Sequence, residues 1–171
     1  NRKWIGIAPF AAHTSKQYPL GLMQQVVAFL QQEHQVILFG FGKEEHAQLD
    51  VWANAYKHVA NATGIYAFAA ELRLIAQLDL MISMDSANGH LAANYNVPVL
   101  TLWGNTHPCL GFAPFEQPQK NSLTPDLTAY PLLPTSVYGN KKVKGYQDAM
   151  RSIAPKTVIE FALEVLGGKM P

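Results

Sequence analysis

Residues 78–104 read "LDLMISMDSANGHLAANYNVPVLTLWG", and this stretch decides the fold of the chain. Two apolar runs, at 78–83 and 97–103, stand on either side of the polar heptapeptide "MDSANGH" at 84–90. A continuous apolar run of this length is typical of a strand that is buried on both faces of a parallel sheet. The residues between the two runs predict a helix over 86–95, so the stretch is expected to form a strand, a helix and a second strand.

The same order of elements recurs towards the N-terminus. Apolar runs predict three further strands, at 3–9, 35–40 and 58–63. Apolar residues at helical spacing predict helices at 19–33 and 68–77, and a polar face with acids in the first turn predicts one at 43–56. Buried strands that alternate with helices indicate a parallel sheet covered on both faces. We therefore predict the α/β class, with a Rossmann-like, doubly wound parallel sheet of five or six strands.

Residues 104–150 break this alternation. They are rich in proline, glycine, asparagine and aromatic residues and show no sustained period. A segment of this length in a compact domain is usually functional or partly disordered. A last helix is expected over 154–168, started by Pro155 and stopped by Gly167.

Composition and charge exclude several classes of function. The formal net charge of the 171 residues is +1 with no basic block, so we expect no nucleic-acid partner. No apolar run reaches the roughly 18 residues of a membrane span. Cys109 is the only cysteine, which excludes an internal disulfide and fits a reducing, cytoplasmic setting. The histidines form no zinc-binding spacing, so we expect no metal.

Polar residues follow three of the predicted strands. They stand in "PFAAHTSK" at 9–16, "FGFGKEE" at 39–45 and "MDSANGH" at 84–90. In open α/β sheets, ligands bind beyond the carboxyl ends of the strands. The convergence of these three segments at one edge of the sheet is the main evidence for a binding site.

The heptapeptide at 84–90 has the features of a phosphate site. The small residues Ser86, Ala87 and Gly89 leave the first-turn amides of the helix uncovered, and the helix dipole favours an anion there. His90 lies in the same turn and could donate to the same phosphate. Asp85 would repel a phosphate, so a sugar hydroxyl or a backbone amide is its better partner. The alternative is an ordinary helix cap with an incidental histidine.

The other two strand ends offer further candidates, each with a simpler alternative. Lys16 can reach a diphosphate as a point charge, or it is a solvated surface lysine. Glu44 and Glu45 either meet a ribose or cap the following helix. Tyr66 either stacks on a base or packs against its neighbours.

Taken together, these segments resemble glycosyltransferase family 9, the lipopolysaccharide heptosyltransferases. "DSANGHLAA" followed by "VPVLTLWGNTHP" is similar to the family's D-T/S-G-x-x-H-L-A-A signature and its next strand, which ends in G-x-T-x-P. "SKQYP" resembles the K-x-W-P segment, "FGFGKEE" the W/G-G-x-x-x-E segment, and "SIAPKTVIEFALEVL" the closing I-x-P-x-x-V helix. The resemblance covers nearly the whole chain, but only the second half of such an enzyme.

The resemblance implies a GT-B architecture, in which two Rossmann-like domains face each other. Residues 1–171 would be a single donor-binding domain for a nucleotide sugar, typically ADP-heptose. The acceptor, a lipopolysaccharide core or another glycan, and the catalytic base would belong to an N-terminal domain absent from this chain. Transfer would be inverting and would use neither a metal nor a cofactor. We expect this chain alone to bind donor nucleotide without turnover, in the cytoplasm or at the inner face of the inner membrane.

The resemblance also assigns roles to individual residues. It implies diphosphate binding by Lys16, by His90 and by the amides of Ser86, Ala87 and Asn88. It implies that Glu44, rather than Glu45, meets the ribose, that Tyr66 lies beside the adenine and that Asp85 meets hydroxyls of the donor sugar. The chain departs from the family at Ala11 and Ala12, where hydroxyl residues are common, and at Ala87, where glycine is commoner. These departures leave the donor base and sugar open.

Two rival interpretations remain open at this point. The first is another enzyme on the GT-B scaffold, such as an epimerase or a transferase that uses a UDP-sugar. The second is a non-enzymatic α/β module that binds a protein partner through residues 104–150.

Overall fold

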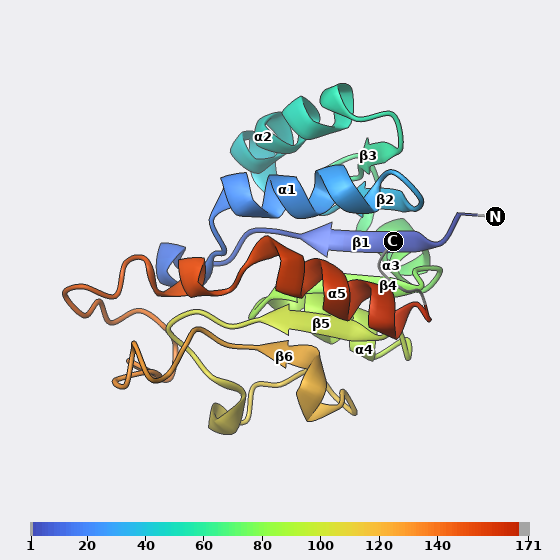
Figure 1. The fold of residues 1–171 in the computed structure, drawn as a ribbon. Helices are drawn as coiled ribbons and strands as arrows, with labels where there is room; N and C mark the ends of the chain where they lie inside the picture. Colours follow the sequence, from blue (N-terminus) through green and yellow to red (C-terminus); the bar gives the residue numbers. More distant parts are fainter. Residues whose placement is uncertain (1, 168–171) are drawn as a thin grey trace.

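Six parallel strands form one sheet in the order β3-β2-β1-β4-β5-β6 in the computed structural model, which describes residues 2–167 (Figure 1). The strands are β1 (Trp4–Ala8), β2 (Gln35–Leu38), β3 (Val59–Asn61), β4 (Leu80–Met84), β5 (Val99–Leu102) and β6 (Ser122–Leu123). This order runs outward from β1 in both directions and confirms the predicted Rossmann-like, doubly wound sheet.

The helices lie in two layers, one on each face of the sheet (Figure 1). They are α1 (Leu20–Leu30), α2 (Gly42–Ala55), α3 (Phe68–Ile75), α4 (Ala87–Ala93) and α5 (Pro155–Val165). Residues of α1, α2 and α5 share one hydrophobic cluster with the sheet, and residues of α3 and α4 share the other. The last predicted helix is thus present, although Gly168 at the end of its expected span lies outside the described residues.

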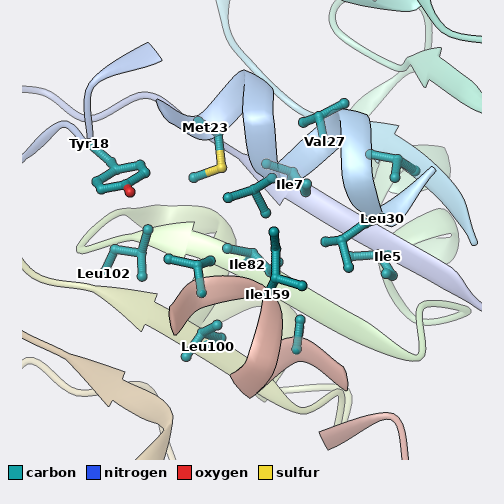
Figure 2. Packing of buried hydrophobic residues seen from close by; sticks show 14 of the residues in the cluster. Ile5, Ile7, Tyr18, Met23, Val27, Leu30, Ile82, Leu100, Leu102 and Ile159 are labelled. Atoms are coloured by element: carbon teal, nitrogen blue, oxygen red, sulfur yellow. The ribbon is translucent and has the colours of Figure 1, made fainter. Parts of the chain in front are cut away.

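The larger cluster fills the space between the sheet and the helices α1 and α5. Figure 2 shows Ile5, Ile7 and Ile82 of the sheet against Met23 of α1 and Ile159 of α5. The four side chains from β1, β4 and α1 are completely buried. Complete burial of such a side chain stabilises the fold by about 1.5–3 kcal/mol, which explains why the apolar runs in the sequence predicted the strands well.

Residues 104–150 form several short elements joined by loops. They contain the helical turns η2 (Pro108–Leu110) and η3 (Gln119–Asn121) and the two-residue strand β6. A further turn, η4 (Ala149–Ser152), leads into α5. In Figure 1 the olive and orange parts of this segment lie largely beyond the carboxyl ends of the strands. The segment therefore shares that edge of the sheet with the predicted site.

None of the helices within residues 2–167 combines the length and the apolar character that crossing a membrane requires.

Candidate functional site

The pairing of β1 with β4 brings two predicted site residues together. Ala8 is in register with Ser83, so the chain leaves both strands at neighbouring points of the same edge. Lys16 ends the short helical turn η1 (Thr14–Lys16) after β1, and Asp85 directly follows β4. The Lys16 Nζ lies 2.8 Å from the Asp85 Oδ2, and the two side chains are 13% and 8% exposed. The sequence assigned these groups to different parts of a ligand, whereas the structure pairs them with each other.

A third side chain completes this polar cluster. The Thr106 hydroxyl, which follows β5, donates to the same Asp85 Oδ2 at 2.8 Å. Neither interaction uses the other carboxylate oxygen, Oδ1. A lysine ammonium has three donors, so Lys16 can bind Asp85 and still donate to an anion.

A cavity of about 770 Å³ opens beside the pair at the carboxyl ends of the strands. This volume lies within the range of small-molecule sites. Six of the residues with a predicted role line it, namely Lys16, Tyr66, Asp85, Ser86, Ala87 and Asn88. Residues 39–42 and Glu45 line it too, so the three predicted strand-end segments meet around one cavity, together with Tyr66 after β3.

The charges around the cavity are unevenly distributed. Lys16 brings a positive charge, whereas Glu45, Glu71 and Asp85 are acidic. Burial raises the pKa of the Glu71 carboxyl above its ordinary value. Glu45 and Glu71 would repel a diphosphate, whereas the Lys16 ammonium offsets the charge of Asp85, so the end of the cavity at Lys16 suits a diphosphate best. The acidic parts of the wall suit hydroxyl groups, which can donate to carboxylates.

The start of α4 is open to a ligand, for reasons that differ in part from the prediction. Ser86 is the N-cap residue, yet among the described residues its side chain makes no capping hydrogen bond. Ala87 is exposed and Gly89 is buried. A Cβ at Gly89 would lie 2.5 Å from the Ser83 Oγ, so this glycine lets α4 pack closely on β4. The small size of Gly89 thus serves packing, and the interpretation that it also leaves the helix amides uncovered stays a prediction.

Two residues with a predicted role do not line the cavity within the described part of the chain. They are Glu44 and His90, while their neighbours Glu45 and Leu91 do line it. The side chains of successive residues in a helix point about 100° apart. When one of two neighbouring side chains faces the cavity, the other therefore points away from it. The Glu45 carboxylate also accepts a hydrogen bond from the Phe41 amide at 2.7 Å. Which glutamate meets a ribose, and whether His90 meets a phosphate, stay predictions.

The structure also adds residues that sequence reasoning missed. Thr106 stands in the "GNTHP" stretch, which supported the family resemblance but received no role. The aromatic residues Phe39, Phe41 and Phe68 line the cavity beside Tyr66. Phe41 is 90% exposed, which makes it available for contact with a flat ligand group. An exposed phenylalanine next to a strand cannot be told from a buried one by sequence alone.

Within residues 2–167, no three histidine, cysteine, aspartate or glutamate side chains lie close enough to hold a metal ion. Metal-independent chemistry remains a prediction.

Comparison with known families identifies the chain. The family model for glycosyltransferase family 9 (heptosyltransferase) matches residues 1–141. The chain belongs to glycosyltransferase family 9. This match confirms the resemblance found in the strand-end motifs and extends through most of residues 104–150. No curated protein matches the sequence.

Solved structures of this family share the fold. The chain is 22% identical to ADP-heptose LPS heptosyltransferase II of E. coli, covering 96% of this chain and 46% of that one, with a TM-score of 0.69. The E. coli heptosyltransferase WaaC with ADP is 16% identical, and the match covers 96% of this chain and 44% of WaaC, with a TM-score of 0.71. The family 9 glycosyl transferase of Veillonella parvula DSM 2008 is 18% identical, and the match covers 96% of this chain and 46% of that one, with a TM-score of 0.74. The chain thus spans less than half the length of these relatives.

Proposed function

We propose that this chain is the donor-binding domain of a family 9 glycosyltransferase and that its cavity binds a nucleotide sugar. The observation that carries the proposal is the Lys16–Asp85 pair in the wall of a 770 Å³ cavity at the carboxyl ends of the strands. A cation beside a carboxylate matches a donor that joins a diphosphate to a hydroxyl-rich sugar. The family and the position of the cavity in the sheet support the same conclusion.

The proposed donor is ADP-heptose, and the proposed acceptor is a lipopolysaccharide core. Lys16 and the amides of Ser86, Ala87 and Asn88 bind the diphosphate, and Asp85 meets hydroxyls of the sugar. Tyr66 lies beside the adenine, and a glutamate at the start of α2 meets the ribose. Support for an adenine nucleotide comes from the relatives, of which E. coli WaaC is described with ADP.

The chemistry required of this domain is stabilisation of the leaving group. Transfer breaks the bond between the anomeric carbon and the diphosphate oxygen, and both electrons of that bond leave with the diphosphate. The charge that develops there is stabilised by the Lys16 ammonium, which its contact with Asp85 holds in place. In the proposed mechanism, a base on a separate acceptor-binding domain removes the proton of the attacking hydroxyl. The domain alone is then expected to bind the donor but not to transfer the sugar.

A nucleotide panel in a thermal-unfolding assay tests the proposal. A ligand that binds the folded state raises its stability by RT ln(1 + [L]/Kd), about 2.7 kcal/mol at a hundredfold excess over Kd. We expect ADP to raise the melting temperature more than UDP does, and adenosine to act less than ADP.

The other outcomes of this panel separate the alternatives. A larger effect of UDP would favour a transferase or epimerase that uses a UDP-sugar. The absence of any effect of ADP, UDP or GDP at millimolar concentration would reject donor binding and leave the protein-binding module as the better interpretation.

A further inference from the structure

The backbone around Lys16 is held by a part of the chain that is distant in sequence. We use the term strap for residues 104–106 together with 135–141, and both of these segments contact the η1 turn. The Ser15 carbonyl accepts a hydrogen bond from the Asn105 amide at 3.0 Å, and the Ser15 hydroxyl donates to the Gly139 carbonyl. The two parts of the strap are joined to each other, because the Thr135 amide donates to the Asn105 carbonyl at 3.0 Å.

The strap also packs directly against the Lys16 side chain. A Cβ at Gly139 would lie 2.7 Å from both the Cγ and the Cδ of Lys16 and 3.1 Å from the Cγ2 of Thr106. A Cβ at Gly104 would lie 2.8 Å from the Lys16 Cα. Only glycine allows the backbone to come this close, and Gly139 also has a φ of +70°, which other residues rarely adopt. Two glycines of the strap therefore pack against Lys16, Gly104 at its Cα and Gly139 at the aliphatic part of its side chain.

The far end of the same side chain is fixed by the strap as well. Thr106 belongs to the strap and donates to the Asp85 Oδ2, the oxygen that Lys16 contacts. Its hydroxyl is buried with the carboxylate, since Thr106 is 1% and Asp85 8% exposed. The strap thus restrains the stem of Lys16 through Gly139 and the partner of its ammonium through Thr106.

We propose that Gly139 and Thr106 are positioning residues, which hold the Lys16 ammonium where it binds the diphosphate of a nucleotide. This inference rests on the proposed function, since it assigns the strap to the same donor site. A lysine has about 2 kcal/mol of rotamer entropy to lose when it is fixed. Because the strap has already restrained Lys16 in the free protein, less of that entropy is lost when the diphosphate binds.

The test compares Gly139→Ala with Gly145→Ala in the protein, by titration with ADP and with adenosine. Both glycines have positive φ, +70° and +86°, so alanine introduces a similar backbone strain at each. A Cβ at Gly145 meets nothing within 4 Å, whereas a Cβ at Gly139 collides with Lys16. We expect Gly139→Ala to weaken ADP binding about tenfold and adenosine binding less than twofold. Gly145→Ala is expected to change neither.

Two further variants keep the test decisive if Gly139→Ala does not fold. Thr106→Val removes the hydroxyl at nearly constant shape and is expected to weaken ADP binding. Thr106→Ser retains the hydroxyl and is expected to bind ADP as the unmodified protein does. In a Lys16→Ala background, Gly139→Ala and Thr106→Val should have no further effect on ADP, because the residue that they position is gone.

The outcomes distinguish this inference from the proposed function. If the unmodified protein binds no nucleoside diphosphate, the proposed function fails. If the unmodified protein binds ADP but Gly139→Ala and Thr106→Val bind it within twofold of the same affinity, the positioning role is overturned. Equal weakening of ADP and adenosine would also overturn it, because a general distortion of the cavity would then be the cause.

Discussion

The two ends of the β1–β4 strand pair each carry a lysine and an aspartate. At the amino end, Lys3 precedes β1 and Asp79 precedes β4, and their charged atoms lie 3.7 Å apart with the side chains 49% and 38% exposed. At the carboxyl end, Lys16 and Asp85 lie 2.8 Å apart and are largely buried. Each end also has a hollow, of about 600 Å³ beside Asp79 and about 770 Å³ beside Asp85.

Neither the residue types nor the volume of a hollow identifies a site. The Lys3–Asp79 pair is solvated, and such pairs contribute about 0–1 kcal/mol to stability. Asp79 is engaged in the fold, because its carboxylate accepts from the Trp4 amide at 2.8 Å. The Lys16–Asp85 pair is enclosed by the strap and faces a cavity with aromatic walls. The two pairs therefore differ in burial and surroundings rather than in residue type.

The largest effect is expected from removing each lysine in turn. Lys16→Met leaves the buried Asp85 with Thr106 alone, so we expect the free energy of unfolding to fall by about 1–3 kcal/mol and ADP binding to weaken at least tenfold. Lys3→Met, its control at the amino end, should change stability by less than about 0.5 kcal/mol and leave ADP binding unchanged. Denaturant unfolding and calorimetric titration measure both quantities. If Lys16→Met and Lys3→Met changed stability and ADP affinity by similar amounts, the proposed difference between the two lysine–aspartate pairs would be wrong.

A smaller effect is expected from Tyr18→Phe, which tests burial near the carboxyl end without touching the pair. The Tyr18 hydroxyl is fully buried and donates to the Ile153 carbonyl at 2.7 Å, so its loss should cost about 1 kcal/mol. Burial raises the pKa of Tyr18 to about 12. In the unfolded chain the pKa of this tyrosine is about 10. The difference between the two pKa values stabilises the folded protein below pH 10, and this stabilisation is lost as the pH rises to 12.

The measurement for Tyr18→Phe is the free energy of unfolding across that pH range. The unmodified protein should lose stability between pH 10 and pH 12, and the difference between the two proteins should shrink there. ADP binding at neutral pH should be unchanged. A large loss of ADP affinity would mean that the carboxyl-end site depends on the packing around Tyr18 rather than on the Lys16–Asp85 pair.

The smallest effect concerns His34, which is near the amino-end pair. Burial lowers the pKa of His34. The positive charges of Arg2 and Lys3 lower this pKa further, whereas the negative charges of Glu33 and Asp79 raise it. Neither ring nitrogen has a hydrogen-bond partner among the described residues. Because the unfolded chain binds the proton more readily, stability should fall as the pH drops below about 6.5.

His34→Gln should flatten this acid dependence of stability while leaving the pH profile of ADP binding unchanged. Thermal unfolding and ADP titration between pH 5 and pH 7.5 measure the two profiles. An altered ADP profile in this variant would show that the two ends of the sheet are coupled.

Much of the fold could be predicted because its signals are local. The strand expected at 35–40 is observed at Gln35–Leu38, and the helix expected at 43–56 is observed at Gly42–Ala55. β6 was missed, since two residues are too few to show a period. It pairs with β5 because the preceding chain returns to the sheet edge, which is a property of the tertiary structure.

The sequence indicated six of the residues that line the cavity, whose roles stay predictions, but it did not indicate the contacts between them. Lys16 and Asp85 were both recognised as strand-end residues, because a parallel sheet collects such residues at one edge. Their ion pair could not be seen, since it depends on how β1 and β4 neighbour each other in space. Nothing in the sequence marked Gly139, which acts through a contact with a residue more than a hundred positions away.

The hydrogen bond between Ser15 and Gly139 joins positions that are 124 residues apart, and the bond between Tyr18 and Ile153 joins positions 135 apart. During synthesis the ribosome makes β1 and the Lys16 turn before Gly139, one of the residues that fix this turn. Contacts this distant in sequence close slowly, because the intervening chain must first be ordered. A nascent chain can therefore pair the strands β1 to β6 before Gly139 is made, and the restraint on Lys16 forms only afterwards.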